Sequence, residues 1–315
     1  MNYFLGVDGG QSGTTALIGD ETGRVLGVGH GGPANHAAAA EGRARLERAV
    51  STSVGDACVA AGLPGNQAFA AACFGLSGGP GGKEQILGTL VRAEQLIVTT
   101  DAEIALRGAT ETGQGIIVIA GTGSIALGRN AAGTQARAGG WGYVYGDEGS
   151  AFDIVRQAMR AALRIEEGWG TQTNLRQVLL DASGCGSANE LLHEFYGSAW
   201  PRDRVAALAP LVDAAANDGD PVARNVLNAA AQQLAELAAA VRTQLWKDGE
   251  PLHVAYAGGV FGSGVLRERF RMLVTLESGI NCSPPLYTAA EGALLAAYEA
   301  VGLSVERLSR LANCR

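Results

Sequence analysis

Phe4-Leu-Gly-Val-Asp-Gly-Gly-Gln-Ser-Gly-Thr-Thr-Ala-Leu-Ile18 is the stretch from which the rest of the chain can be interpreted. Apolar runs flank a short glycine-rich break, a pattern that predicts a β-hairpin with a glycine turn. Asp8 ends the first strand, and the hydroxyls of Ser12, Thr14 and Thr15 follow. Glycines let backbone N–H groups approach a bulky anion, and a carboxylate beside a phosphate needs a cation such as Mg²⁺ between them. The stretch therefore fits a magnesium-phosphate loop as well as a plain hairpin turn.

The composition bounds the class of protein. The chain has 315 residues, of which 47% are hydrophobic and 17% charged, so a sizeable core can form without disulfides. A net charge of −7 argues against nucleic acid or an anionic membrane as partners. Five scattered cysteines without a C-x-x-C pair indicate reduced thiols. With no signal-peptide pattern at the N-terminus and no helix candidate that could cross a bilayer, we expect a soluble, cytoplasmic protein.

The first hundred residues alternate strands with helices. After the hairpin, a third strand over 24–29 completes an antiparallel meander. The pattern then predicts a helix, a strand, a helix and a strand, over 37–61, 68–76, 84–92 and 95–100. The last strand stops at Asp101. Polar residues at strand ends predict an α/β domain with its ligand at the carboxyl ends of the strands.

The pattern then restarts. Residues 114–120 predict a strand, Gly121-Thr-Gly-Ser124 the break, and 125–128 the return strand, in the same order as residues 3–23. This indicates an internal duplication, with two phosphate-type loops able to face each other across a cleft. We expect an N-terminal domain over 1–112, joined by a C-terminal helix within 289–315, and a second domain over 113–288.

The remainder is predicted to be mainly helical. A strand over 252–257 ends in the glycine-rich turn 258–264. The predicted helices cover 152–166, 173–180, 188–196, 201–217, 221–247, 266–274, 289–301 and 304–311.

Three loops together resemble a known superfold. Asp8-Gly-Gly with its hydroxyls, Gly121-Thr-Gly-Ser124 and Ala257-Gly-Gly-Val260 are similar to the first phosphate loop, second phosphate loop and adenosine loop of the actin/Hsp70/hexokinase superfold. That resemblance implies an α/β fold of two duplicated RNase H-like domains with an interdomain cleft.

Within that superfold the chain resembles the BadF/BadG/BcrA-type ATPase family, and in particular its N-acetylglucosamine kinases. The similarity runs from Gly6 to about Ala293. The most specific segments are Thr99-Thr-Asp-Ala102, Ala120-Gly-Thr-Gly-Ser124, Gly139-Gly-Trp-Gly142 and Gly146-Asp-Glu-Gly-Ser150.

The resemblance implies roles for individual residues. Asp101 would be the general base that takes the proton from the sugar 6-hydroxyl as it attacks the γ-phosphate of ATP, which agrees with what phosphoryl transfer needs. Asp8 would lie beside Mg²⁺, through water. The phosphates would contact Gly9, Gly10, Ser12, Thr14, Gly121, Thr122, Gly123 and Ser124, and the adenosine would contact Gly258 and Gly259. The sugar would contact Asn35, Ser77, Gly78, Asp101, Trp141, Gly142 and Asp147.

Each of these residues also has a plainer interpretation. Asp101 could cap the helix that follows its strand, and Trp141 could be a core anchor. Gly258 and Gly259 could form a simple strand-to-helix turn. One departure from the family pattern is Gln11, which adds bulk where a backbone amide should approach phosphate.

Several functions fit this resemblance. The leading one is ATP-dependent phosphorylation of N-acetylglucosamine, with glucosamine or N-acetylmuramate as alternative substrates, in a homodimer that closes over sugar and ATP. An ATPase that activates a dehydratase or reductase is disfavoured, because Cys185 and Cys282 lack the paired spacing of a cluster site. A sugar-sensing regulator would add a DNA-binding helix-turn-helix, for which no N-terminal extension is present.

Overall fold

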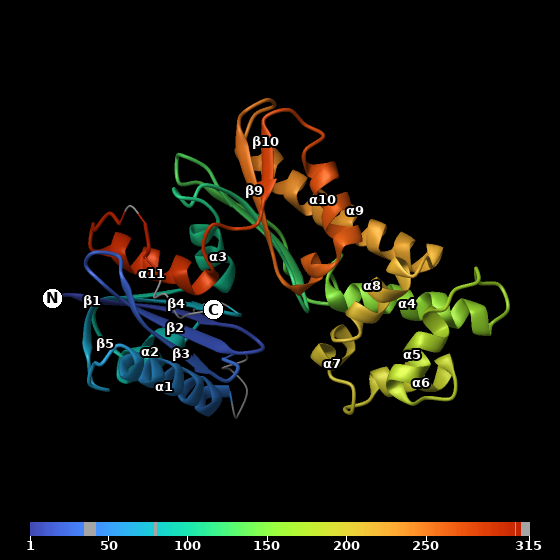
Figure 1. The fold of residues 1–315 in the computed structure, drawn as a ribbon, viewed down its shortest axis with the longest axis horizontal. Coiled ribbons are helices and arrows are strands. Elements are labelled where there is room, and N and C mark those ends of the chain that lie inside the picture. Colours follow the sequence, from blue (N-terminus) through green and yellow to red (C-terminus); the bar gives the residue numbers. More distant parts are fainter. Residues whose placement is uncertain (35–41, 79–80, 306, 310–315) are drawn as a thin grey trace. The chain divides into compact units, whose positions relative to one another are not determined.

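The computed structural model describes residues 1–34, 42–78, 81–305 and 307–309 of the chain. It divides into two compact units (Figure 1). Unit 1 comprises residues 1–114 and 285–315, and unit 2 comprises residues 115–284.

Unit 1 is a mixed five-stranded sheet with helices on both faces. Its elements are β1 (Tyr3–Gly9), β2 (Thr14–Asp20), β3 (Val25–Gly31), α1 (Gly42–Ala60), β4 (Ala68–Leu76), α2 (Lys83–Leu90), β5 (Arg92–Thr99), α3 (Asp101–Ala109) and α11 (Ala289–Ala300).

The strand order in unit 1 is β3-β2-β1-β4-β5. β1 pairs antiparallel with β2, β2 pairs antiparallel with β3, and β4 and β5 continue the sheet in parallel with β1. Because parallel strands end at the same edge, the residues that follow β1, β4 and β5 meet there. Asp8 lies in register with Thr15 of β2 and Gly75 of β4 at that edge.

Successive residues of β1 contribute to opposite faces of the sheet, as the pleat requires. Leu5 belongs to the core that α1 and α2 complete, whereas Phe4 belongs to the core formed with α3 and α11. In Figure 1, α1 and α2 accordingly lie on one side of the strands, and α3 and α11 on the other. The sheet of unit 1 is therefore covered on both faces by residues far apart in sequence.

A glycine allows α11 to lie close to β1. A Cβ at Gly6 would lie only 2.3 Å from the backbone nitrogen of Leu294 in α11. Any side chain there would push the helix away from the strand that carries Asp8.

Unit 2 combines a second five-stranded sheet with a larger set of helices. Its elements are β6 (Gly115–Ala120), β7 (Ser124–Arg129), β8 (Gln135–Gly139), α4 (Ala151–Glu166), α5 (Leu175–Ser183), α6 (Ala188–Tyr196), α7 (Arg202–Ala206), α8 (Ala209–Asn217), α9 (Pro221–Leu245), β9 (Leu252–Ala257), the 3₁₀ helix η1 (Gly259–Gly262), α10 (Gly264–Val274) and β10 (Ile280–Ser283).

The two sheets have the same topology. Unit 2 has the order β10-β9-β6-β7-β8, in which β6, β7 and β8 form an antiparallel meander and β9 and β10 are parallel to β6. Unit 1 repeats this arrangement strand for strand. The α/β fold class with two duplicated domains, expected from the restart at residue 114, is confirmed.

α9 is the longest helix and organises the core of unit 2. It packs against β6, β7 and β8 and also contacts α4, α8 and α10. Its buried face includes Leu227, Leu234 and Val241. Pro221 occupies its first turn, and the Asp220 carboxylate accepts hydrogen bonds from the amides of Val222 and Ala223, so the helix has both a fixed start and a cap.

Two predicted helices were wrong in part. Residues 201–217 form two helices, α7 and α8, because Pro210 has no N–H with which to continue a single helix through residues 206–208. Residues 304, 305, 307 and 308 are not helical. Instead, Ser309 pairs with the turn of unit 1, where its amide donates to Gly23 O at 3.0 Å and its carbonyl accepts from Val25 N at 3.1 Å.

The short strands β8 and β10 were not predicted. Within the described ranges, no helix combines the length and the apolar character needed to cross a membrane.

Candidate active site

Asp101 is the first residue of α3, immediately after β5. The cap of this helix is Thr100, whose hydroxyl accepts from Glu103 N at 3.1 Å while the Glu103 carboxylate accepts from Thr100 N at 3.3 Å. The plainer role considered for Asp101, that of helix cap, is therefore filled by its neighbour. The Asp101 carboxylate remains at the carboxyl edge of the sheet, where the positive end of the helix dipole favours an anion.

Ser77 and Lys83 form a chain of contacts with Asp101. The Ser77 hydroxyl donates to Asp101 Oδ2 at 2.6 Å. The Lys83 ammonium donates to the Ser77 carbonyl at 2.7 Å. Gly78, with a φ of +78°, makes the turn that leads away from Ser77, a conformation that glycine adopts without strain. Ser77 and Asp101 were predicted as site residues, but Lys83 was not.

Asp8 is electrostatically coupled to Asp101. Burial raises the pKa of the Asp8 carboxyl to about 6, and the negative charge of Asp101 contributes in the same direction. A carboxylate whose ionised form is disfavoured by burial and by a neighbouring negative charge is a suitable environment for a divalent cation.

The donor set fits Mg²⁺ held jointly with phosphate. Within the described ranges, no group of three or more His, Cys, Asp or Glu residues is arranged to hold a metal. Mg²⁺ in phosphoryl-transfer sites is commonly held by one or two carboxylates together with waters and substrate phosphates. Asp8 supplies such a carboxylate.

The first glycine loop closes with a short backbone hydrogen bond. Gly10 N donates to Gly13 O at 2.9 Å. A Cβ on Gly9 would lie 2.4 Å from a methyl group of the buried Leu76 side chain, which would have to move to admit it. The Thr14 hydroxyl donates to Gly32 O at 2.8 Å, whereas Ser12 is exposed on the loop. Of Ser12 and Thr14, the two hydroxyl residues of this loop predicted to contact phosphate, Ser12 is thus the one that is accessible to solvent.

The second glycine loop, in unit 2, closes in the same way. Gly121 N donates to Gly123 O at 2.9 Å. Among the described residues, the amides of Thr122 and Gly123 donate no backbone hydrogen bond. Successive free amides in a turn form a concave site for an anion. Both loops are therefore closed by the same kind of backbone hydrogen bond.

Arg202 and Asp147 brace this second loop. Asp147 is 4% exposed, is paired with Arg202, and accepts from Ser124 N at 3.3 Å. Arg202 also donates to Thr122 O at 3.1 Å. Asp147 has a φ of +61°, which is uncommon for a residue other than glycine. The predicted sugar ligand Asp147 is thus tied to the phosphate loop of unit 2, through an arginine that sequence patterns did not indicate.

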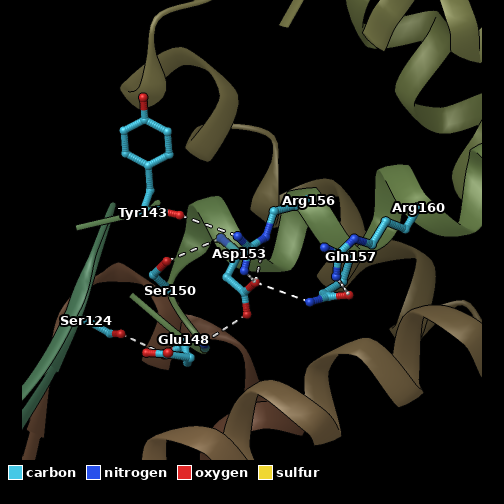
Figure 2. A network of polar contacts seen from close by, with 9 residues as sticks. Ser124, Tyr143, Glu148, Ser150, Asp153, Arg156, Gln157 and Arg160 are labelled. Atoms are coloured by element: carbon cyan, nitrogen blue, oxygen red, sulfur yellow. Dashed lines mark hydrogen bonds and ion pairs between the residues drawn. The ribbon is translucent and has the colours of Figure 1, made fainter. Parts of the chain in front are cut away.

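A polar network holds the segment that carries Asp147 (Figure 2). The Ser124 hydroxyl donates to Glu148 O at 2.6 Å. The Asp153 carboxylate accepts from Gly149 N at 3.1 Å and forms an ion pair with Arg156 at 2.6 Å. The predicted phosphate ligand Ser124 therefore uses its hydroxyl to join β7 to the segment before α4.

Trp141 is not a core residue. It is 66% exposed, and the Arg137 guanidinium lies 4.5 Å from the centroid of its ring. Tyr143 and Tyr145 on the same loop are exposed as well. Gly142 has a φ of +81°, and no atom would lie within 4 Å of an added Cβ. The alternative role for Trp141, that of core anchor, is excluded.

The two glycines of the predicted adenosine loop differ from each other. Gly258 has a φ of +103°, and a Cβ there would lie 2.3 Å from Ala120 O, so the turn after β9 requires glycine. Gly259 starts η1, and no atom would lie within 4 Å of an added Cβ. Packing therefore explains Gly258 and leaves Gly259 without a structural requirement.

Each unit assembles its own share of the predicted residues. In unit 1, Ser77 N donates to Gly9 O at 3.0 Å, which joins the end of β4 to the first loop beside Asp8 and Asp101. In unit 2, the second loop lies against Asp147. Asn35 lies outside the described residues. Lys83, Arg202 and Asp153 were missed because a single charged residue carries no signal of the contacts that it makes, whether its partners are near in sequence, as for Asp153, or distant, as for Arg202.

Comparison with known proteins identifies relatives along nearly the whole chain. Residues 5–297 match the BadF/BadG/BcrA/BcrD ATPase family. An N-acetylmuramic acid/N-acetylglucosamine kinase of Clostridium acetobutylicum is 33% identical over 282 residues, which cover 88% of this chain and 91% of that protein. An N-acetyl-D-glucosamine kinase of Dictyostelium discoideum is 30% identical over 277 residues, covering 81% and 84% respectively.

Solved structures support the same relationship. The fold is similar to that of a candidate N-acetylglucosamine kinase from Chromobacterium violaceum, with a TM-score of 0.77, 30% identity, and coverage of 94% of this chain and 98% of that one. A ROK family glucokinase from Streptomyces griseus, in complex with glucose and AMPPNP, shares the fold at a TM-score of 0.55 and 20% identity, with coverage of 95% and 100%. The chain therefore belongs to the BadF/BadG/BcrA/BcrD ATPase family.

Proposed function

We propose that this protein is an ATP-dependent hexosamine kinase that phosphorylates N-acetylglucosamine on its 6-hydroxyl, with Asp101 as the general base. The observation that carries the proposal is the position of Asp101. It begins α3 at the carboxyl edge of the sheet, and its Oδ2 accepts from the Ser77 hydroxyl. Thr100 already caps the helix, so local structure does not require a carboxylate at position 101.

The chemistry needs few groups from the protein. Phosphoryl transfer depends on positioning, on neutralising charge, and on one carboxylate near the attacking hydroxyl. Asp101 would accept the proton from the sugar hydroxyl, while the Ser77 hydroxyl holds the carboxylate in one orientation. Mg²⁺, when bound near Asp8 through water, would neutralise phosphate charge.

The two glycine loops are the proposed phosphate-binding elements. The exposed Ser12 and the backbone around Gly9 and Gly10 would serve in unit 1, and the free amides of Thr122 and Gly123 in unit 2. Gly258 and Gly259 would contact the adenosine. Membership of an ATPase family supports ATP as the nucleotide.

A further set of residues would contact the sugar. We place Asn35, Ser77, Gly78 and Asp101 of unit 1 in this role, together with Trp141, Gly142 and Asp147 of unit 2. The exposed indole of Trp141 offers an apolar face to a sugar ring. The buried carboxylate of Asp147 would accept from sugar hydroxyls.

N-acetylmuramate is the second candidate substrate. It is supported by the Clostridium acetobutylicum relative, which is described as acting on both N-acetylmuramic acid and N-acetylglucosamine. Neither that relative nor the one from Dictyostelium discoideum is described as acting on glucosamine.

A substrate panel tests the proposal. Release of ADP from Mg·ATP would be measured with N-acetylglucosamine, N-acetylmuramate, glucosamine, N-acetylmannosamine and glucose, and NMR would locate the phosphate on the product. We expect turnover with N-acetylglucosamine and a 6-phosphate product. Sugar-independent ATP hydrolysis, or phosphate on the anomeric oxygen, would refute the proposal. Homodimer formation stays a prediction, which light scattering in solution tests.

A further inference from the structure

Lys83 is a buried cation in unit 1. Its side chain is 4% exposed, at the first position of α2. Burial lowers the pKa of the Lys83 ammonium, and the negative charge of Asp101 opposes that shift. Removing a charge from water is costly unless other groups compensate it. A side chain that only filled space at this position would be apolar.

Lys83 is connected to Asp101, the predicted base, through Ser77. Nζ donates to the Ser77 carbonyl at 2.7 Å, and the Ser77 hydroxyl donates to Asp101 Oδ2 at 2.6 Å. Ser77 N donates to Gly9 O, which ties the same residue to the first glycine loop. Lys83 therefore fixes the carbonyl of the residue whose hydroxyl fixes Asp101.

The positive charge of Lys83 is not cancelled by an adjacent acid. Within the described ranges, no carboxylate oxygen lies within ion-pair distance of Nζ, although Asp101 is near enough to influence the ammonium. The charged group that acts on it is Asp101 at the start of α3. A buried cation near Asp101 lowers the free energy of its ionised form.

Lysine is a rare choice in this chain. Lys83 and Lys247 are its only lysines among 24 basic residues. The ammonium is a compact point charge that fits a single carbonyl, whereas the guanidinium of arginine is a planar fork with five donors. The surroundings of residue 83 thus match the smaller cation.

We propose that Lys83 is a positioning residue for phosphoryl transfer: it anchors Ser77, which orients the Asp101 carboxylate, and its charge offsets that of Asp101. This inference rests on the proposed kinase function and assigns to Lys83 no direct contact with substrate. A positioning residue affects the rate of the chemical step more than it affects substrate binding, because a small misplacement of the base lowers the fraction of reactive geometries.

The test compares Lys83→Met with Lys83→Arg and with Lys247→Met, a control at the exposed second lysine. Steady-state and rapid-quench kinetics with N-acetylglucosamine and Mg·ATP would give kcat, both KM values and the rate of the chemical step. We expect Lys83→Met to lower kcat and the chemical step by about 10- to 100-fold, with both KM values within about threefold of wild type. Lys83→Arg should recover part of that loss, and Lys247→Met should match wild type.

A double-mutant cycle tests whether Lys83 acts through Ser77. If it does, the fold-decrease in kcat of Ser77→Ala/Lys83→Met is smaller than the product of the fold-decreases of the two single variants. Losses that multiply fully would overturn this route. Thermal unfolding of each variant confirms that the folded protein is being compared. If Lys83→Met does not fold, Lys83→Gln takes its place in both experiments.

The outcomes separate the inference from the function on which it rests. If the wild-type protein phosphorylates no amino sugar, the proposed function fails and the inference fails with it. If the wild-type protein is active and Lys83→Met retains kcat within about twofold, or raises only a KM, the inference alone is overturned.

Discussion

Asp8 is a carboxylate whose ionised form the fold makes unfavourable. Its pKa in the folded protein is about 6, compared with an ordinary value of 3.8, because of burial and the charge of Asp101. Between these two pH values the folded state retains a proton that the unfolded state has released. The contribution of Asp8 to the free energy of unfolding therefore falls as the pH rises through this window.

Asp8→Asn removes this unfavourable contribution. We expect the variant to exceed wild type in free energy of unfolding by about 1–2 kcal/mol at pH 7.5, allowing for partial exposure, and to match it at pH 3.5. Urea denaturation at both pH values measures the difference. Mg·ATP should raise the melting temperature of wild type more than that of the variant. If Asp8→Asn is instead less stable than wild type at pH 7.5, the raised pKa of Asp8 is wrong.

Arg202 stabilises the second glycine loop of unit 2. It pairs with the buried Asp147 and donates to Thr122 O. Arg202→Met leaves a buried carboxylate without its partner, which costs several kcal/mol at fully buried sites. We expect about 1–3 kcal/mol here, because the arginine side chain is 26% exposed, together with a higher KM for ATP from a loosened loop. Calorimetry and steady-state kinetics measure the two effects. An unchanged KM for ATP would show that the pair does not shape the loop.

For individual residues, the sequence identified the candidate reactive carboxylates but not the side chains that contact them. Asp8 and Asp101 stood out because each ends an apolar strand, and the structure brings them close enough to interact electrostatically. Lys83 and Arg202 could not be found in this way, because their partners, Ser77 and Asp147, are reached only once the chain has folded. The competing cap role of Asp101 was resolved by the hydroxyl of its neighbour, Thr100.

At the scale of elements, the turn after β9 offers a matched pair of glycines. Gly258→Ala places a Cβ 2.3 Å from Ala120 O at a φ of +103°, so we expect a loss of roughly 2–4 kcal/mol in the free energy of unfolding. Gly259→Ala meets no atom within 4 Å and should leave the melting temperature unchanged.

Nucleotide kinetics then separate packing from function at this turn. If the turn contacts adenosine, Gly259→Ala raises the KM for ATP several-fold while leaving the KM for the sugar unchanged. Wild-type kinetics in this stable variant would remove the turn from the nucleotide site.

Regular elements were predictable where periodicity was long or strictly apolar. β4 and β9 have the predicted bounds, and α6 does as well. β8 and β10 are only 5 and 4 residues long and were missed, since such short segments have no period of their own. The segment after α11 was predicted as a helix, but Ser309 instead pairs through its backbone with Gly23 and Val25. That contact is tertiary and leaves no local pattern.

At the scale of the whole molecule, the duplication explains why two similar loops occur. Each sheet begins with an antiparallel meander and continues with two parallel strands. In both units, the glycine loop joins the first two strands and is closed by one backbone hydrogen bond. The restart of the pattern was visible in the sequence because the glycines recur at the same place. The C-terminal helix α11 returns to unit 1.

This return makes unit 1 depend on residues at the end of the chain. Leu294 of α11 is fully buried in the core with Phe4 and Ile104. We expect Leu294→Ala to lower the free energy of unfolding by about 2–4 kcal/mol, whereas Leu286→Ala, at a position that is 55% exposed, should have little effect. Hydrogen exchange localises the change. Protection should fall in β1 and β4 rather than in β6, and loss in both sheets alike would contradict the division into two units.

Asp101 is the proposed base in phosphorylation of the sugar 6-hydroxyl. The most direct measurement is kcat for N-acetylglucosamine in Asp101→Asn, with sugar binding measured in parallel by calorimetry. We expect kcat to fall by about 10²–10⁴-fold while the sugar still binds within about tenfold of the wild-type affinity. If the variant keeps kcat within about tenfold of wild type, Asp101 is not the base, and another carboxylate must take that role.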